Sequence, residues 1–385
     1  MSRAAPAFQL LARDGRARRG RLLTAHGEVE TPAFMPVGTQ AAVKACHPGE
    51  VAETGARMLL ANFYHLALRP GVDLVHGLGG LHRFMGWPGP ILTDSGGYQL
   101  VSLGELVELE DGGVTFRSPY DGAVVRFTPK GVVEGQRRLG SDVIMVLDHP
   151  VPYGTGLEPT KEATRRTHLW ARSCREADVG DSLLFGIVQG GFDAASRADS
   201  ARVVAELGFD GVALGGLVLG EPPPVRRAAI DASLAEVGPE LPRYLMGLGT
   251  DLDLLDSVAR GVDLFDCVLP TRLARTGTFL FGSGRLSLRH ARFRADATAL
   301  EPGCDCPACA GFSRAYLRHL FLAHEILAHR LLSLHNLRHL ARLMAAARQA
   351  IEVGRLQDLI TQRVGPGPVG AAGEIAGTGA ASVRP

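Results

Sequence analysis

Eight short apolar runs that alternate with amphipathic segments constrain the fold of this chain more than any other feature of its sequence. The intervening segments, such as PVRRAAIDASLAEVG, place apolar residues at helical spacing. Alternating strands and helices build a parallel sheet with crossover helices. Eight such units without a GxGxxG motif favour an α/β fold closed as a (β/α)8 TIM barrel over an open doubly wound sheet. The runs span residues 56–62, 89–94, 141–148, 182–189, 209–216, 242–249, 261–266 and 276–282.

Five of these runs end in polar side chains that can take part in chemistry: Asn62, Asp94, Asp148, Gln189 and Asp266. In a barrel of parallel strands the carboxyl ends converge on one face, where the active site lies. A single Asp or Asn at a strand end is readily explained as a helix cap. Three carboxylates and two amides on one rim are better explained as a catalytic site.

The residues around these strand ends suit a planar, purine-sized substrate. Tyr98, in the segment TDSGGYQ, offers a stacking surface, and Met246 offers a polarisable second wall unless it is simply part of the core. Asp148, Gln189 and the backbone of residues 215–221 supply donors and acceptors for the edge of a ring. We therefore expect a site for a purine-like base.

The segment VDLFDCVLPTRLARTG, residues 262–277, places the carboxylate of Asp266 beside Arg272 and Arg275. Two carboxylates that flank a glycosidic bond can break it, and Asp94 and Asp266 fit this pairing. Residues 270–350 contain twelve Arg and four Asp or Glu, a basic face that favours nucleic acid as the partner. A base within a polymer must leave its stack, and the two arginines would then hold the flanking phosphates.

Three of the six cysteines, Cys304, Cys306 and Cys309, lie close together, which indicates metal binding in a reducing compartment rather than disulfide bonding. One histidine would complete a structural zinc site. Spacing leaves five histidines open as the fourth ligand of this zinc site: His319, His324, His329, His335 and His339.

No apolar run reaches the roughly 18 residues of a membrane span, and the first residues lack the apolar core of a secretory signal, so we expect a cytoplasmic protein without a membrane partner.

Together these segments resemble the bacterial tRNA-guanine transglycosylases, members of the queuine tRNA-ribosyltransferase family. The resemblance runs from about residue 8 to residue 360 and rests on TDSGGYQ, FGIVQG, GGLVLGE, YLMGLG, FDCVLPTR, and CDCPAC followed by LHNL. It implies a TIM barrel with a zinc subdomain inserted near the C-terminal end, and a homodimer that engages one tRNA at a time. It also implies one structural Zn²⁺ per subunit, bound by Cys304, Cys306, Cys309 and His335.

The resemblance implies a reaction as well. The wobble guanine in the anticodon loop of the tRNAs for Asp, Asn, His and Tyr is exchanged for 7-aminomethyl-7-deazaguanine (preQ1), in queuosine biosynthesis. Asp266 would attack the ribose anomeric carbon and form a covalent glycosyl-enzyme, with Asp94 as general acid and base. The remaining implied contacts are Asp148, Gln189, Gly216 and Leu217 at the base, Tyr98 and Met246 on its two faces, and Arg272 and Arg275 on the anticodon region.

The chain departs from the bacterial pattern at some positions and follows it at another. Bacterial members commonly have Glu-Cys where this chain has His149 and Pro150, so we expect a different pocket floor and pH response. Thr250 stands where a lysine that helps to bind tRNA is usual, so we expect one electrostatic contact fewer. Eukaryotic members, which take the bulkier queuine, have a glycine where this chain has Leu219, and Leu219 therefore favours the smaller base.

We expect five segments: an N-terminal antiparallel β cap (1–45), the main part of the barrel (46–290), a zinc-binding subdomain (291–345), a C-terminal helix (346–364) and a disordered, Gly/Ala/Pro-rich tail (365–385). Three alternatives remain. A related enzyme could act on DNA or on archaeal tRNA, although the archaeal type normally carries an additional RNA-binding domain. A non-catalytic RNA-binding subunit would not need both Asp94 and Asp266. A barrel hydrolase would carry its metal ligands at the strand ends.

Overall fold

A closed barrel of parallel strands forms the centre of the computed structural model, which describes residues 7–102 and 107–364. Within these residues eight strands are paired in the order β4-β14-β13-β12-β11-β10-β6-β5. A bridge between Val37 and Leu60 joins β4 to β5 and closes the sheet. The strands are β4 (Ala33–Pro36), β5 (Leu59–Asn62), β6 (Ile91–Asp94), β10 (Val143–Met145), β11 (Leu183–Val188), β12 (Gly211–Leu214), β13 (Arg243–Leu245) and β14 (Leu264–Cys267).

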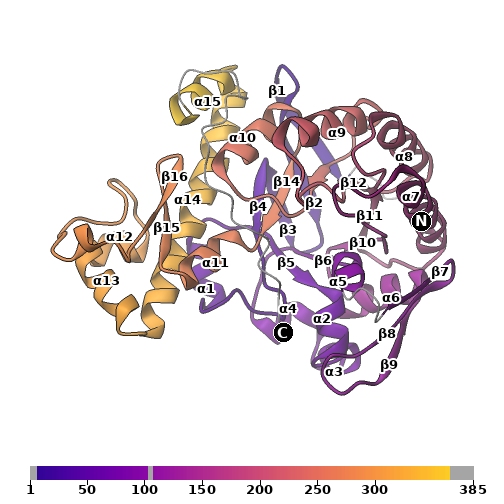
Figure 1. The fold of residues 1–385 in the computed structure, drawn as a ribbon, viewed down its shortest axis with the longest axis horizontal. Coiled ribbons are helices and arrows are strands. Elements are labelled where there is room, and N and C mark those ends of the chain that lie inside the picture. The colour runs from indigo at the N-terminus through magenta and orange to yellow at the C-terminus, as the bar shows by residue number, and fades with distance from the viewer. Residues whose placement is uncertain (1–6, 103–106, 365–385) are drawn as a thin grey trace.

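Helices cover the outside of this barrel (Figure 1). Every residue of β11 and β12 is buried, as expected for parallel strands that are covered on both faces. Several helices begin at a side chain that accepts an N–H of the first turn, including Thr128, Asp193 and Thr250. The predicted TIM barrel is confirmed. The helices around it are α1 (Pro48–Glu53), α6 (Pro129–Leu139), α7 (Leu157–Arg175), α8 (Ala194–Glu206), α9 (Pro223–Ala235), α10 (Asp251–Ala259) and the C-terminal half of α14 (Ile326–Glu352).

One strand assignment was wrong. The apolar run at residues 276–282 does not enter the barrel, because Thr278–Phe281 forms β15 and pairs antiparallel with β16 (Gly284–Ser287). Its place is taken by β4, in the segment expected to belong to the N-terminal cap, which pairs in parallel with β14. β4 is only four residues long and ends in Pro36, so its pattern resembles hairpin material. Its position depends on distant partners, β14 and α14, that the local pattern does not contain.

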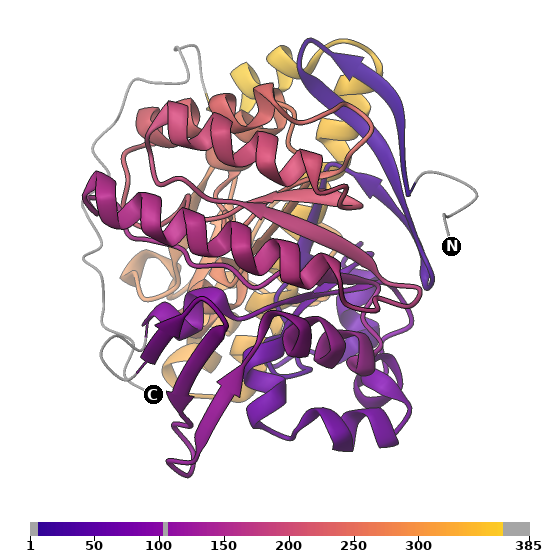
Figure 2. The same cartoon turned by 90° about the vertical axis from the view of Figure 1, so that its right-hand side faces the viewer.

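The N-terminal antiparallel sheet is present and lies against the amino ends of the barrel strands. It consists of β1 (Phe8–Asp14), β2 (Ala17–Thr24) and β3 (Gly27–Thr31). Arg18 forms an ion pair with Asp263, directly before β14, at 3.1 Å, and the His26 N–H donates to Asp142, directly before β10. The sheet therefore covers the barrel end opposite the predicted catalytic rim, and Figure 2 shows its strands in indigo along one side of the molecule.

Insertions decorate the barrel between β5 and α6. Helices α2 (Phe63–Leu68), α3 (Val72–Gly77) and α4 (Gly80–Met85) connect β5 to β6. After α5 (Gly97–Ser102) comes a small antiparallel sheet of β7 (Val107–Glu110), β8 (Gly113–Arg117) and β9 (Val124–Phe127). The aromatic rings of Phe116 and Phe127 on this sheet pack against Tyr64 of α2. The insertion is thus anchored next to the strand ends of β5 and β6.

The last part of the described chain forms a lobe beside the barrel with its own apolar core (Figure 1). It follows α11 (Leu269–Arg275) and contains the β15–β16 hairpin, the 3-10 helix η2 (Ala291–Phe293), α12 (Pro307–Gly311) and α13 (Arg314–Leu322). Helix α14 continues from this lobe onto the barrel, so the expected boundary at residue 345 falls within one helix, and α15 (Leu356–Val364) follows. The predicted tail, 365–385, lies outside the described residues. Among those residues, no helix has the length and apolar character that crossing a membrane requires.

Candidate active site and metal site

A cavity of about 410 Å³ opens at the carboxyl ends of the barrel strands. Gln189 lies next to it and is hydrogen-bonded to Asp148, whereas Arg275 lies outside its lining on α11. The structure thus brings nearly all of the predicted substrate residues together on one face. The predicted residues that line the cavity are Asp94, Tyr98, Asp148, Gly216, Leu217, Met246, Asp266 and Arg272.

Asp266, at the end of β14, is held by one of its two carboxylate oxygens. The Tyr244 hydroxyl donates to Oδ1 at 2.6 Å, and the Gly247 N–H donates to the same oxygen at 2.7 Å. Burial raises the pKa of Asp266, while these two hydrogen bonds oppose the rise. Burial and the charge of Asp266 also raise the pKa of Tyr244, so its hydroxyl remains a donor. No described residue donates to Oδ2, which is therefore available to a ligand.

Asp94, at the end of β6, is suited to proton transfer. The Asn62 side-chain amide donates to Asp94 Oδ2 at 2.9 Å. Burial, together with the negative charges of Asp148 and Asp266, raises the pKa of Asp94 to about 7. A carboxyl group with this pKa is roughly half protonated at neutral pH, so it can both donate and accept a proton.

Asp148 and Gln189 form a polar wall on the neighbouring strand ends. Gln189 Nε2 donates to Asp148 Oδ2 at 2.7 Å, and burial raises the pKa of Asp148 to about 6. The other side-chain atom of the amide, Gln189 Oε1, is buried without a described hydrogen-bond partner. A β-carbon at Gly97 would lie 2.1 Å from Asp148 Oδ1, so only glycine fits there. An unsatisfied acceptor beside a carboxylate matches a flat ligand that carries hydrogen-bond donors at its edge.

None of the three carboxylates at this face, Asp94, Asp148 and Asp266, forms an ion pair with a described Lys, Arg or His side chain. Arg272 lines the cavity but does not reach them within 4 Å. Three acids that are held close together without a neutralising partner are costly for the fold. Such an arrangement is typical of a catalytic site, where perturbed pKa values are useful.

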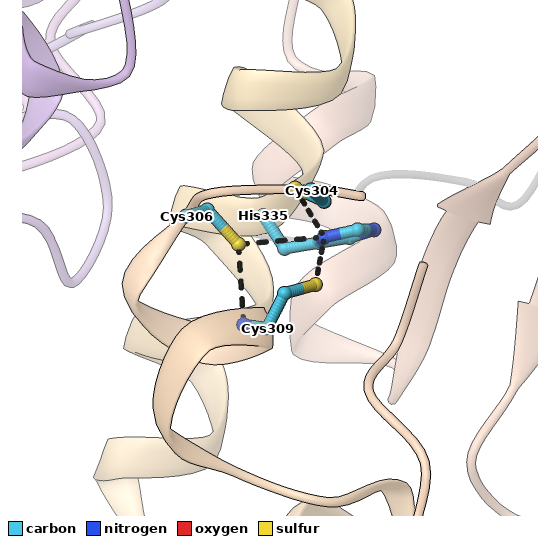
Figure 3. Close-up of side chains that lie close together, drawn as sticks. All are labelled: Cys304, Cys306, Cys309 and His335. Atoms are coloured by element: carbon cyan, nitrogen blue, oxygen red, sulfur yellow. Dashed lines mark hydrogen bonds between the residues drawn. The ribbon is translucent and has the colours of Figure 1, made fainter. Parts of the chain in front are cut away.

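A second cluster, formed by Cys304, Cys306, Cys309 and His335, lies in the lobe beside the barrel (Figure 3). The three sulfur atoms lie 3.8, 3.6 and 3.4 Å from His335 Nδ1, and all four candidate ligand atoms are within 4.8 Å of one another. The His335 Nε2 atom lies 2.8 Å from the Leu280 carbonyl oxygen, which leaves Nδ1 facing the sulfur atoms. Three thiolates and one imidazole form a closed tetrahedral donor set that can hold a metal ion.

Comparison with known proteins then identifies the family. A family model described as queuine tRNA-ribosyltransferase matches residues 14–365. The chain belongs to the queuine tRNA-ribosyltransferase family. A protein of that name from Solidesulfovibrio magneticus is 53% identical over 355 residues, which is 90% of this chain and 94% of the relative. The queuine tRNA-ribosyltransferase from Pelotomaculum thermopropionicum is 52% identical over 88% of this chain and 92% of the relative. The one from Thermus thermophilus is 49% identical over 91% of this chain and 91% of the relative. The expected family and its enzymatic nature are confirmed.

One residue of this family member's candidate catalytic face was not predicted from the sequence. Tyr244, which holds Asp266, reads as an ordinary core aromatic in a buried strand. A signal was present, since Tyr244 is two residues before Met246, and side chains two apart in a strand point to the same side. Among the histidines that spacing left open, His339 lies one turn after His335 but contacts Asp251 at 2.8 Å instead of the sulfur atoms.

The residues at which this member of the queuine tRNA-ribosyltransferase family departs from the bacterial pattern have defined places. Pro150 lines the cavity, whereas the His149 Nδ1 atom lies 3.2 Å from Arg166. Burial and the charge of Arg166 lower the pKa of His149 to about 4, so this histidine is neutral at physiological pH. Thr250 caps α10 by accepting the Asp253 N–H. Leu219 also lines the cavity.

Proposed function

We propose that this enzyme is a tRNA-guanosine(34) transglycosylase that exchanges the wobble guanine of the tRNAs for Asp, Asn, His and Tyr for preQ1. Family membership supports tRNA-guanine transglycosylation as the reaction class. The observation that carries the finer proposal is that two carboxylates in one cavity differ in their hydrogen bonding and in their pKa. Asp266 presents a free oxygen while its other oxygen is held, and Asp94 has a pKa near neutrality.

The proposed reaction has two displacements. A carboxylate oxygen of Asp266 attacks ribose C1′, the bond from C1′ to N9 of guanine breaks, and its electron pair leaves with the base. Asp94 donates its proton to the departing guanine and becomes a carboxylate. In the second displacement Asp94 takes the corresponding proton from the incoming base, whose nitrogen attacks C1′ and releases Asp266. The second displacement restores the proton of Asp94 and the free carboxylate of Asp266 that the first displacement consumed, so no further reactant is needed.

For the base, we propose that it donates to the Asp148 carboxylate and forms hydrogen bonds with Gln189, Gly216 and Leu217, with the ring held between Tyr98 and Met246. The buried, unpaired Gln189 Oε1 atom supports this assignment, because a bound ligand would give it a partner. The exposed ring of Tyr98 supports a stacking role. Leu219 in the lining favours the smaller 7-deazaguanine over bulkier queuine.

For the tRNA, we propose phosphate contacts from Arg272 and Arg275 at the carboxyl end of α11. Both side chains are exposed and lie on successive turns of one short helix beside Asp266. Neither forms an ion pair with an acidic residue in the described part of the chain, so both guanidinium groups are available for phosphates. Thr250 is engaged as a helix cap, and we expect no phosphate contact from it.

We propose that the metal is one structural Zn²⁺ ion per subunit, held by the four-residue cluster in the lobe. The donor set is the one zinc prefers, and it lies away from the strand ends where a catalytic metal would be needed.

We also propose a cytoplasmic homodimer. Exposed apolar side chains around the start of α14, namely Leu322, Ile326 and Leu327, are candidates for its contact surface. Elemental analysis would test the metal, and sedimentation of the purified protein would test the dimer.

Incorporation of labelled guanine into unmodified tRNA tests the proposed function. Wild-type protein should incorporate label, preQ1 should displace it, and the variant Asp266→Ala should do neither. Denaturing gels should show a covalent protein–RNA adduct for the wild type only. A DNA stem-loop of the same sequence should be a poorer substrate, which tests the alternative of a DNA-acting enzyme. Equal incorporation by wild type and Asp266→Ala would exclude Asp266 as the nucleophile.

A further inference from the structure

Arg197, on α8, is a fully buried cation behind the wall of the base cavity. Its three nitrogen atoms all donate to backbone carbonyl oxygens. Nε donates to Gly191 at 2.7 Å, Nη1 to Val188 at 3.1 Å and Nη2 to Gly215 at 2.8 Å. Val188 is the last residue of β11, and Gly191 and Gly215 belong to the loops that follow β11 and β12. One guanidinium group therefore joins the loop that carries Gln189 to the loop that carries Gly216.

The charge of Arg197 has no direct counter-ion. No described carboxylate lies within ion-pair distance, and only the more distant charge of Glu221 favours the cationic form. Burial lowers the pKa of Arg197 to about 9. A buried cation without a carboxylate partner is unfavourable unless its hydrogen-bond geometry is well satisfied. The planar fork of arginine can satisfy three separate carbonyl oxygens, whereas the single nitrogen of lysine cannot reach all of them in the same arrangement.

The same face of α8 also holds Gln189 by its backbone. The Gln189 N–H donates to Ser200 Oγ at 3.1 Å, and Ser200 lies three residues after Arg197. The contacts around Gly216 show how little space is left between these groups. A β-carbon at Gly216 would lie 2.6 Å from Gln189 Oε1 and 3.6 Å from Arg197 Nη2. A shift of the guanidinium group would therefore move the wall that contains Gln189 and Gly216.

We propose that Arg197 and Ser200, on one face of α8, are positioning residues for the exchanged base. The guanidinium group of Arg197 sets the distance between Gln189 and the Gly215–Gly216 backbone, and so sets the width of the site that receives the edge of the base. This inference rests on the proposed function, because it requires that a base binds between these groups. It predicts that loss of the three-way contact weakens binding of the free base far more than binding of tRNA.

Arg18 provides a matched control for the structural effect of changing a buried arginine. It is 2% exposed, donates to the Leu241 carbonyl oxygen at 2.9 Å, and pairs with Asp263 at the opposite end of the barrel. Both Arg197→Lys and Arg18→Lys should lower thermal stability. Only Arg197→Lys should change the properties of the base site. A purely structural role for Arg197 would give two variants with similar kinetics per mole of folded enzyme.

The experiment measures kcat and KM for labelled guanine at saturating unmodified tRNA, and KM for tRNA at saturating guanine. We expect Arg197→Lys to raise KM for guanine about tenfold, because buried carbonyl oxygens lose their donors, while KM for tRNA changes less than about twofold. An unchanged KM for guanine, or an equal rise in Arg18→Lys, would overturn the inference. If the wild type incorporates no guanine at all, the proposed function fails instead.

A milder variant keeps the test decisive if Arg197→Lys is not recovered as folded protein. Ser200→Ala removes the hydrogen bond to the Gln189 N–H, together with a 2.9 Å contact to His168 Nε2 on the outer helix α7, and leaves Arg197 in place. The inference then requires a rise of roughly threefold or more in KM for guanine, with KM for tRNA unchanged. Wild-type values of both constants in Ser200→Ala would show that α8 does not position Gln189, and would contradict the inference.

Discussion

The two ends of this barrel bury the same type of side chain in opposite electrostatic settings. At the amino ends of the strands, Asp263 pairs with Arg18 at 3.1 Å, and Asp142 lies 2.9 Å from His26 and 3.1 Å from His82. At the carboxyl ends, Asp94, Asp148 and Asp266 have no ion-pair partner among the described residues. The carboxylates at the amino end contact basic side chains, whereas those at the carboxyl end lie near one another without such contacts.

The pKa values of Asp142 and Asp94 reflect this difference between the two ends. Burial by itself raises the pKa of Asp142, but hydrogen bonds from His82, from the Ile91 N–H and from His26 bring it below its usual value. At the other end burial and two neighbouring carboxylates raise the pKa of Asp94 to about 7. Asp263 departs from this contrast, since burial raises its pKa to about 6, as it does for Asp148 at the other end, although Arg18 opposes the rise. We therefore propose that Asp142 contributes stability at the amino end, and that the raised pKa of Asp94 suits the carboxyl end to proton transfer.

The largest expected effect is that of Asp266→Asn at the carboxyl end. An amide cannot form the glycosyl ester, so guanine incorporation should fall by about 10⁴-fold or more. The free energy of unfolding should not fall by more than about 1 kcal/mol, since the change removes one of three mutually repelling charges. Initial rates and urea unfolding measure the two quantities. An Asp266→Asn variant that is strongly destabilised but keeps its activity would contradict this expectation.

Asp263→Asn should have the opposite profile at the amino end. It leaves the Arg18 guanidinium buried without its carboxylate, which should cost about 3–5 kcal/mol of unfolding free energy. Activity per mole of folded enzyme should stay at the wild-type level, because Asp263 lies at the far end of the barrel from the cavity. Urea unfolding and active-site titration check both expectations. A large loss of kcat in folded protein would contradict the separation of the two ends.

Tyr244→Phe should show how much the orientation of the Asp266 carboxylate contributes to the rate, because it leaves the carboxylate itself in place. The change removes the 2.6 Å hydrogen bond to Asp266 Oδ1 and keeps the ring in the core. A hydrogen bond to a charged group contributes about 1.5–3 kcal/mol, so kcat should fall by roughly 10- to 100-fold. Because that bond opposes the rise in the pKa of Asp266, the acidic limb of kcat/KM for tRNA should move to higher pH. An unmoved acidic limb would argue that Gly247 alone holds the carboxylate.

The pKa of Asp94 predicts opposite pH limbs for the two substrates. Its folded pKa is raised to about 7, so the proton is present below pH 7 and lost above it. In the proposed mechanism, formation of the glycosyl-enzyme needs the protonated form, so kcat/KM for tRNA should fall about tenfold per pH unit above 7. The second displacement needs the carboxylate, so kcat/KM for the base should fall about tenfold per unit below 7. Limbs in the same direction would rule out a single residue in both roles.

The smallest expected effect is that of His82→Leu at the amino end. It removes one of several hydrogen bonds to Asp142 and should cost about 1 kcal/mol of stability with no change in kcat. The folded pKa of Asp142 is depressed, so its contribution to stability is present at neutral pH and is lost as the pH falls. Removal of His82 should therefore move acid unfolding to higher pH. Acid titration followed by circular dichroism would measure this shift.

Much of the architecture could be predicted because it rests on local patterns. Apolar runs that end in Asp94, Asp148 and Asp266 indicate parallel strands whose ends converge, and the spacing of Cys304, Cys306 and Cys309 indicates a metal site. These features need only the chemistry of the residues and their separation along the chain. The barrel and the location of its candidate site followed from the sequence for that reason.

The tertiary structure decided what depends on partners far away in the chain. Ala33–Pro36 rather than residues 276–282 completes the barrel, because pairing with β14 cannot be read from a four-residue run. His335 rather than His339 faces the cysteines, since the fold of the lobe determines which turn of α14 meets them. Tyr244 and Arg197 look like core residues until the backbone and side-chain atoms that they contact are known. Long-range packing assigned these roles, because the sequence specifies which groups are available but only their positions in space specify what they bind.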